Sequence, residues 1–196
     1  MVFDTTDSMI VVQSYLLYLI LPFWITAGFV DWVLHRQTHI ERTSGLKESL
    51  LHILQMIEVG LPALMAVFLQ INALVILCMF IGFVLHEATG LWDVRYAGAY
   101  RHVSPFEQHV HSFLEVMPLI AGSLVIMLHM DQFLALWGLG NSPADFSFKL
   151  KEVPLSGDYL SAIFCGIVVF VGIPYVEEVV RCFRFRGQCH HTEMRH

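Results

Sequence analysis

The chain has 196 residues, of which 56% are hydrophobic and 14% are charged, and its formal net charge is −6. Soluble domains carry about a quarter of charged residues, so this composition indicates an integral membrane protein and excludes an ordinary soluble domain. The modest negative charge argues against a nucleic-acid partner. Eleven histidines stand beside eleven lysines and arginines, a ratio that points to metal or proton chemistry.

Five mostly apolar segments are long enough to cross a bilayer, which takes about 20 residues. In chain order they are residues 9–34, 50–69, 73–92, 110–130 and 159–176. We therefore predict an all-α fold, a bundle of five transmembrane helices with a four-helix core that holds a metal site near the cytoplasmic face. One transmembrane domain spans residues 1–186, and residues 187–196 form a cytoplasmic tail.

Lysine and arginine mark the cytoplasmic side of membrane proteins. They gather after the first, third and fifth spans, whereas the opposite side has only Lys149 and Lys151. The chain is therefore expected to have its N-terminus outside and its C-terminus in the cytoplasm. The residues on the basic side are Arg36, Arg42, Lys47, Arg95, Arg101, Arg181, Arg184, Arg186 and Arg195.

Acids and histidines recur four residues apart, a spacing that places both on one face of a helix. All of these pairs fall at the cytoplasmic ends of spans, where further histidines join them. The candidate metal ligands are Asp31, His35, His39, Glu48, His52, His86, Glu107, His109 and His111, with Asp93 and His102 as second choices. A lone histidine at a membrane interface is usually only a polar boundary group, but three acid–histidine pairs at one level favour a shared site.

Spans two and four also repeat a short pattern of serine, glutamate, histidine, a deeper glutamate and proline. The deeper acids are Glu58 and Glu115, which lie within the apolar core and which we predict to relay protons. Either the two helical hairpins are related halves or the match is fortuitous.

Carboxylate and imidazole without thiolate form a ligand set for iron, manganese or zinc. Helical bundles build two-metal centres by projecting Glu and His inward from several helices. We therefore expect two metal ions, iron in the first place and manganese or zinc as alternatives.

The segments HRQTH (His35 and His39) and EQHVH (His109 and His111) resemble the integral-membrane di-iron oxygenases, which include fatty-acid and sterol hydroxylases, alkane hydroxylases and desaturases. The resemblance covers roughly residues 31–115; the HxxHH boxes of that family are missing, and carboxylates are more frequent here. It implies O₂-dependent hydroxylation or desaturation of an apolar, lipid-like substrate.

We thus expect a membrane-bound metal-dependent oxidoreductase. The sequence has no glycine-rich dinucleotide motif, so electrons are expected from a donor protein on the cytoplasmic side. Three alternatives stay open. One is a zinc-dependent membrane hydrolase, although His86-Glu87 is followed by Gly90 where an HExxH motif needs histidine. The others are a haem or quinone anchor subunit without enzymatic activity and a proton or ion transporter.

Overall fold

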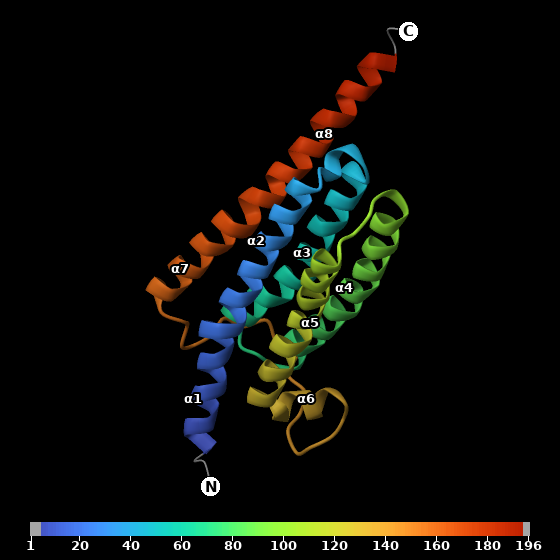
Figure 1. Ribbon diagram of the computed structural model, residues 1–196. Coiled ribbons are helices and arrows are strands. Elements are labelled where there is room, and N and C mark those ends of the chain that lie inside the picture. The colour runs from blue at the N-terminus through green and yellow to red at the C-terminus, as the bar shows by residue number, and fades with distance from the viewer. Residues whose placement is uncertain (1–4, 194–196) are drawn as a thin grey trace.

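The computed structural model describes the backbone of residues 5–193 and the side chains of residues 7–186. Helices form nearly all of the ordered structure (Figure 1). They are α1 (Thr5–Tyr15), η1 (Leu16–Ile20), α2 (Leu21–Gln37), η2 (Ile40–Arg42), α3 (Gly45–Phe68), α4 (Ala73–Tyr100), α5 (Pro105–Leu128), α6 (Met130–Leu136), α7 (Gly157–Ile167), η3 (Val168–Gly172) and α8 (Ile173–Glu193).

Five helices in the described part of the chain are long and apolar enough to cross a membrane, which confirms the five predicted spans. Two of them continue through a short π-helical segment, η1 between α1 and α2 and η3 between α7 and α8. The five helices are Asp7–Gln37, Gly45–Phe68, Ala73–Tyr100, Pro105–Leu128 and Gly157–Arg186. The third reaches eight residues beyond the predicted limit of residue 92, because polar residues continue the helix past the apolar stretch.

Polar caps fix where several helices begin. The Asn72 side chain accepts a hydrogen bond from the Val75 amide at the start of α4. Ser104 accepts one from the Glu107 amide at the start of α5, where Pro105 occupies the first turn. These side chains satisfy amides that have no partner within the helix. The cap at Ser104 therefore sets the position from which Glu107 and His111 project.

The helices α3 and α4 approach closely at Gly82. A Cβ atom at this position would lie only 2.4 Å from the backbone oxygen of Glu58, so glycine allows this contact. In the same bundle α8 packs against both α2 and α3. The fifth span is therefore part of the bundle and not a helix at its margin, which adds a helix to the predicted four-helix core.

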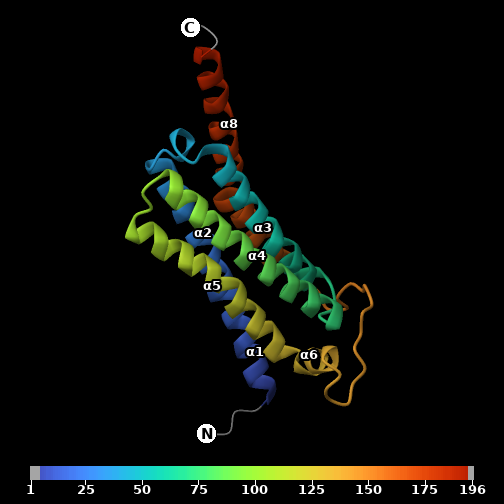
Figure 2. The ribbon, with the colours of Figure 1, turned by 90° about the vertical axis from the view of Figure 1, so that its right-hand side faces the viewer.

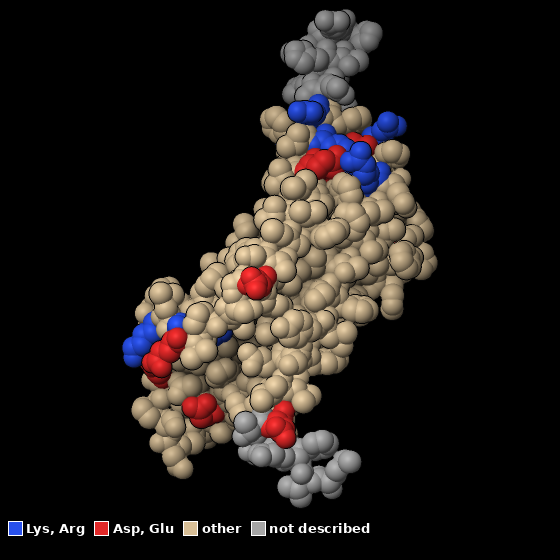
Figure 3. All heavy atoms as spheres, turned by 90° about the vertical axis from the view of Figure 1, so that its left-hand side faces the viewer, with Lys and Arg blue, Asp and Glu red and all other residues tan. Residues whose placement is uncertain are grey.

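The two ends of the bundle differ in charge. The first, called the basic end here, carries every lysine and arginine of the described residues except Lys149 and Lys151. These two lie at the opposite loop end, formed by α6 and residues 137–156 (Figure 2). On the face that Figure 3 shows, a wide band without basic side chains separates the two ends.

Candidate metal centre

Buried carboxylates and imidazoles from all five spans meet near the basic end. None of these side chains belongs to a residue more than 7% exposed. We call them the polar cluster: Asp31 and His35 from α2, Glu48 and His52 from α3, Asp93 from α4, Glu107 and His111 from α5, and Tyr175 and Glu178 from α8.

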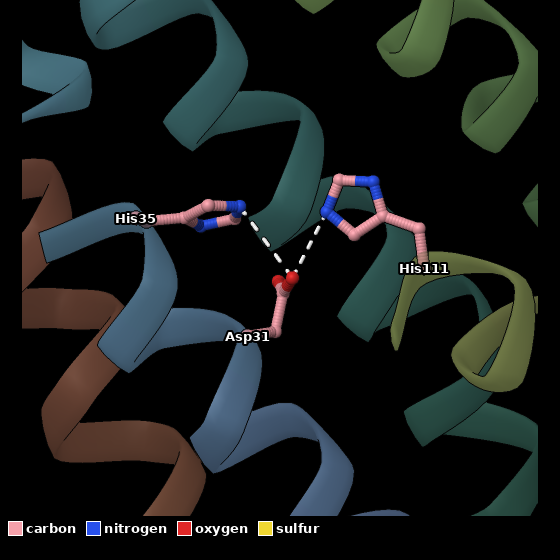
Figure 4. A group of neighbouring side chains, drawn as sticks. All are labelled: Asp31, His35 and His111. Atoms are coloured by element: carbon pink, nitrogen blue, oxygen red, sulfur yellow. Dashed lines mark ion pairs between the residues drawn. The ribbon is translucent and has the colours of Figure 1, made fainter. Parts of the chain in front are cut away.

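Asp31 stands between two imidazoles (Figure 4). Its Oδ1 lies 2.9 Å from Nε2 of His111 and 3.5 Å from Nε2 of His35. None of these three buried atoms has a hydrogen bond of normal geometry. The other oxygen, Oδ2, accepts a hydrogen bond of 3.1 Å from the Tyr175 hydroxyl. One carboxylate oxygen is thus held by the protein, and the other faces two ring nitrogens in an arrangement that fits a shared cation.

Glu178 links His35 to the third imidazole of the cluster, His52. Its Oε1 lies 3.0 Å from Nδ1 of His52, and its Oε2 lies 3.1 Å from Nδ1 of His35. The two rings stack with centroids 4.5 Å apart and an angle of 9° between their planes. With Nδ1–H donating to Glu178, the Nε2 lone pair of His35 is free for a metal, as in carboxylate–histidine–metal arrangements, and that of His52 becomes free if a metal replaces its hydrogen bond to Asp93. Nε2 of His52 lies 3.2 Å from Oδ2 of Asp93.

Arg101, the residue that follows α4, adds a cation to the polar cluster. Its side chain is 3% exposed, and Nη2 lies 2.5 Å from Oε1 of Glu48 and 2.6 Å from Oε1 of Glu107. Burial lowers the pKa of Arg101, but the hydrogen bonds of Glu48 and Glu107 raise it more, so the pKa lies above its usual value. Sequence analysis assigned Arg101 to the cytoplasmic boundary; the structure places it inside, joining α3 to α5.

Two sets of side chains have ligand atoms that all lie within 4.8 Å of one another, and His35 belongs to both. The first set is Asp31, His35 and His111, and the second is His35, Glu48 and His52. Because every member is buried and the donors are carboxylate oxygens and imidazole nitrogens, the sets suit a divalent metal such as iron, manganese or zinc.

A cavity of about 200 Å³ adjoins the cluster. Asp31, His52, Asp93, His111 and Tyr175 line its polar side, and most of the remaining wall is apolar. A second cavity, of about 540 Å³, extends from there toward the loop end. The residues common to both walls are Leu21, Trp24, Val59 and Ala63. A polar ligand set therefore faces a largely apolar space inside the bundle.

The other predicted ligands belong to neither set, although Oε1 of Glu107 lies 3.5 Å from Nε2 of His35. His39 is exposed and its Nδ1 lies 3.2 Å from Oε1 of Glu41, and His109 and His102 are exposed as well. His86 is buried and lines the first cavity, but it belongs to neither set.

The two predicted proton relays lie along the cavities. Glu115 lines the first. Glu58 lines the second, where its Oε1 accepts a hydrogen bond of 2.8 Å from the Thr89 hydroxyl.

Sequence analysis did not assign Arg101, Tyr175 or Glu178 to the site. Tyr175 and Glu178 are three residues apart in α8, a spacing that places them on one helix face and was the available signal. Comparison with protein-family models, with curated proteins and with solved structures finds no match for this chain.

Proposed function

We propose that the polar cluster binds two metal ions and that the chain is a membrane-bound, metal-dependent oxidoreductase. One observation carries the proposal: buried ligand atoms of Asp31, His35 and His111 converge on one point without aligned hydrogen bonds. Buried polar atoms are normally paired, so such a convergence calls for a partner of opposite charge.

The net charge of the buried cluster supports two metal ions. The cluster buries five carboxylates, and the only buried guanidinium that faces them among the described residues is that of Arg101. With neutral imidazoles this leaves four negative charges, which two divalent cations neutralise. The carboxylates are Asp31, Glu48, Asp93, Glu107 and Glu178.

The two helical hairpins supply matching ligands. His111 of α5 faces Asp31 of α2 at 2.9 Å, and His52 of α3 faces Asp93 of α4 at 3.2 Å. We assign one metal ion to each of these carboxylate–imidazole pairs, with His35 beside both and Glu48 within 4.8 Å of the ligand atoms of His35 and His52. Glu48 and Glu107 are the glutamates that hold the same place in the pattern shared by spans two and four. They lie on either side of Arg101.

The reaction we propose is O₂-dependent hydroxylation or desaturation of a lipid-like apolar substrate. Iron bound by carboxylate and imidazole, when present, supplies the activation of O₂ for such reactions. The chain's own contribution is an apolar cavity that admits the substrate and excludes water from the ligand atoms. Glu115, which lines this cavity, would move protons to and from it, with Glu58 one step further.

The proposed orientation follows from the basic end. We propose that this end lies in the cytoplasm and the N-terminus on the opposite side, because exposed arginines favour the cytoplasmic side by the positive-inside rule. An electron-donor protein would dock there, since Arg36, Arg42, Arg184 and Arg186 are exposed at that end.

Elemental analysis with an absorption spectrum of the purified protein tests the proposal. We expect about two iron or manganese ions per chain, and O₂ consumption when a chemical reductant is supplied. One zinc ion per chain without O₂ consumption would favour the zinc-dependent hydrolase. A Soret band in the absorption spectrum would favour the haem anchor subunit. A protein that purifies folded and binds no transition metal on reconstitution would contradict the proposal and leave a transporter as the better reading.

A further inference from the structure

A second group of polar side chains lies in the first cavity, farther from the basic end than the metal ligands. His86 of α4 is 5% exposed, and its ring approaches the Gln55 backbone closely enough for a weak interaction, but neither ring nitrogen has a hydrogen bond of normal geometry. Nε2 of the Gln55 side chain is also buried without a partner. Glu115 of α5 completes the group, and all three residues line the cavity.

The distance of this group from the metal ligands follows from helix geometry. Gln55 lies three residues beyond His52, Glu115 four beyond His111, and His86 seven before Asp93, so the offsets are about 4 to 10 Å along the helices at 1.5 Å per residue. The group therefore stands within one or two turns of the proposed metal ions, on the side of the apolar core. This is the position of a substrate atom near the reacting bond.

The polar ends of Glu115 and Gln55 lie against Gly90 of α4. A Cβ atom at this position would lie 3.4 Å from Oε1 of Glu115 and 3.7 Å from Oε1 of Gln55. The side chains of Glu115 and Gln55 thus extend over α4 at Gly90, where this helix has no side chain. The two polar ends therefore meet at a bare stretch of backbone that itself lines the cavity, where a small group of a ligand can reach them.

We propose that His86 and Gln55, beside Glu115, bind a neutral hydrogen-bonding group, a hydroxyl or carbonyl, at one end of a long apolar substrate. Unpaired buried donors and acceptors are costly, and such a group pairs them. The rest of the molecule runs past Trp24 and Val59 into the second cavity, whose 540 Å³ is of the size that small-molecule sites have.

This inference deepens the proposed function because it names the substrate class and its direction. The polar end of the molecule, and not its hydrocarbon end, faces the metal ligands. Oxidation would then take place on carbons near the hydroxyl or carbonyl group. The binding itself does not require the metal, so it is testable separately.

The experiment compares the binding of 1-hexadecanol and hexadecane to the purified full chain by native mass spectrometry. We expect the wild type to prefer the alcohol over the alkane about tenfold, the effect of one or two hydrogen bonds. His86→Leu and Gln55→Leu should bring this ratio close to one without changing the metal content. Gln13→Leu, a matched change in the second cavity, should leave the ratio as in the wild type.

His86→Gln guards against a variant that fails to fold, because it keeps hydrogen-bonding atoms in place of the ring and should retain part of the preference. Equal binding of both probes by the wild type overturns the proposal. So does loss of metal in His86→Leu, since His86 would then be a ligand. A chain that binds no metal but prefers the alcohol refutes the proposed function and leaves this assignment standing.

Discussion

The loop end and the basic end of the bundle both bury polar side chains, but these find different partners. At the loop end the partners are largely backbone groups. Asn72 donates to the Ser147 carbonyl at 2.8 Å, and Gln132 accepts from the amides of Ala73 and Asp145. Even Lys151, whose pKa burial lowers, donates to the backbone oxygen of Ala66.

At the basic end the partners of the buried groups are other ionisable side chains. Asp31, His35 and His111 face one another with their coordinating atoms unaligned for hydrogen bonds. The comparison gives a criterion for polar residues in an apolar bundle. Polar side chains that form hydrogen bonds with backbone atoms stabilise the fold. Polar side chains that face one another without aligned hydrogen bonds indicate a ligand site.

The largest expected effect is loss of metal on removal of an imidazole at the basic end. His52→Ala and His111→Ala should each lose at least one of two ions, because Asp93 then loses its imidazole partner and Asp31 loses the nearer of its two. His129→Ala, at the loop end, should retain both. Metal per chain after dialysis is the measurement, and full occupancy in both cluster variants would refute the ligand assignment.

Arg101→Leu tests the only guanidinium that the structure places within the cluster. Glu48 and Glu107 would lose their shared cation while staying buried, which costs about 3–5 kcal/mol when one partner of a buried pair is removed. The free energy of unfolding of the metal-free protein in detergent should fall by that amount.

Arg95→Leu is the matched control for Arg101→Leu. Arg95 is exposed near the end of α4, six residues before Arg101, so its replacement should change the free energy of unfolding by less than about 0.5 kcal/mol. If both substitutions lowered the free energy of unfolding equally, the burial of Arg101 between Glu48 and Glu107 would not contribute to stability.

Glu178→Gln should weaken metal binding by about 10- to 100-fold, the usual effect of losing a residue that orients a ligand. A glutamine amide still accepts from one of the two imidazoles but presents N–H groups to the other. Glu178→Asp should restore part of the affinity if the carboxylate charge is what orients the rings. Metal dissociation constants from chelator competition measure both.

The neighbouring Glu177 provides the control for Glu178. It lies outside the cluster and pairs with Arg36 at 2.8 Å and with Arg181 at 3.2 Å. Glu177→Gln should therefore leave the metal affinity unchanged. An equal loss in both variants would mean that charge at this end of α8, and not the bonds to the rings, controls binding.

The sequence predicted the five spans and the three acid–histidine pairs because both are properties of single helices. Apolar length marks a span, and a spacing of four residues marks a shared face. The same geometry explains why His109 lies outside the site. It is two residues from both Glu107 and His111 and therefore points away from the face that these two share.

Contacts between helices could not be predicted in this way. Glu177 and Glu178 are adjacent, so about 100° separates them around α8, and only packing decides which faces the bundle. His39 was expected to continue the face of His35, but α2 ends at Gln37 and His39 has a left-handed φ of 53°. Arg101 looked like a boundary residue because the positive-inside rule says nothing about burial.

The smallest expected effect lies at the loop end, where Asn72 has two separable bonds. Its Oδ1 caps α4 by accepting from the Val75 amide, and its Nδ2 donates to Ser147. Asn72→Ala should lower the free energy of unfolding by about 1 kcal/mol, the usual value of an N-cap. Asn72→Asp keeps the acceptor and loses the donor, so it should recover most of the loss if the cap dominates.

Neither Asn72 variant should change the metal content, because the Asn72 side chain forms its hydrogen bonds with backbone atoms that lie far from the polar cluster. The measurement is metal per chain on the same samples used for unfolding. Metal loss in Asn72→Ala at unchanged secondary structure would mean that packing at the loop end positions the ligands at the other end. The division between a structural end and a ligand-binding end would then be wrong. Loss of the N-cap at Asn72 would have displaced α4, and with it Asp93 at the other end of the helix.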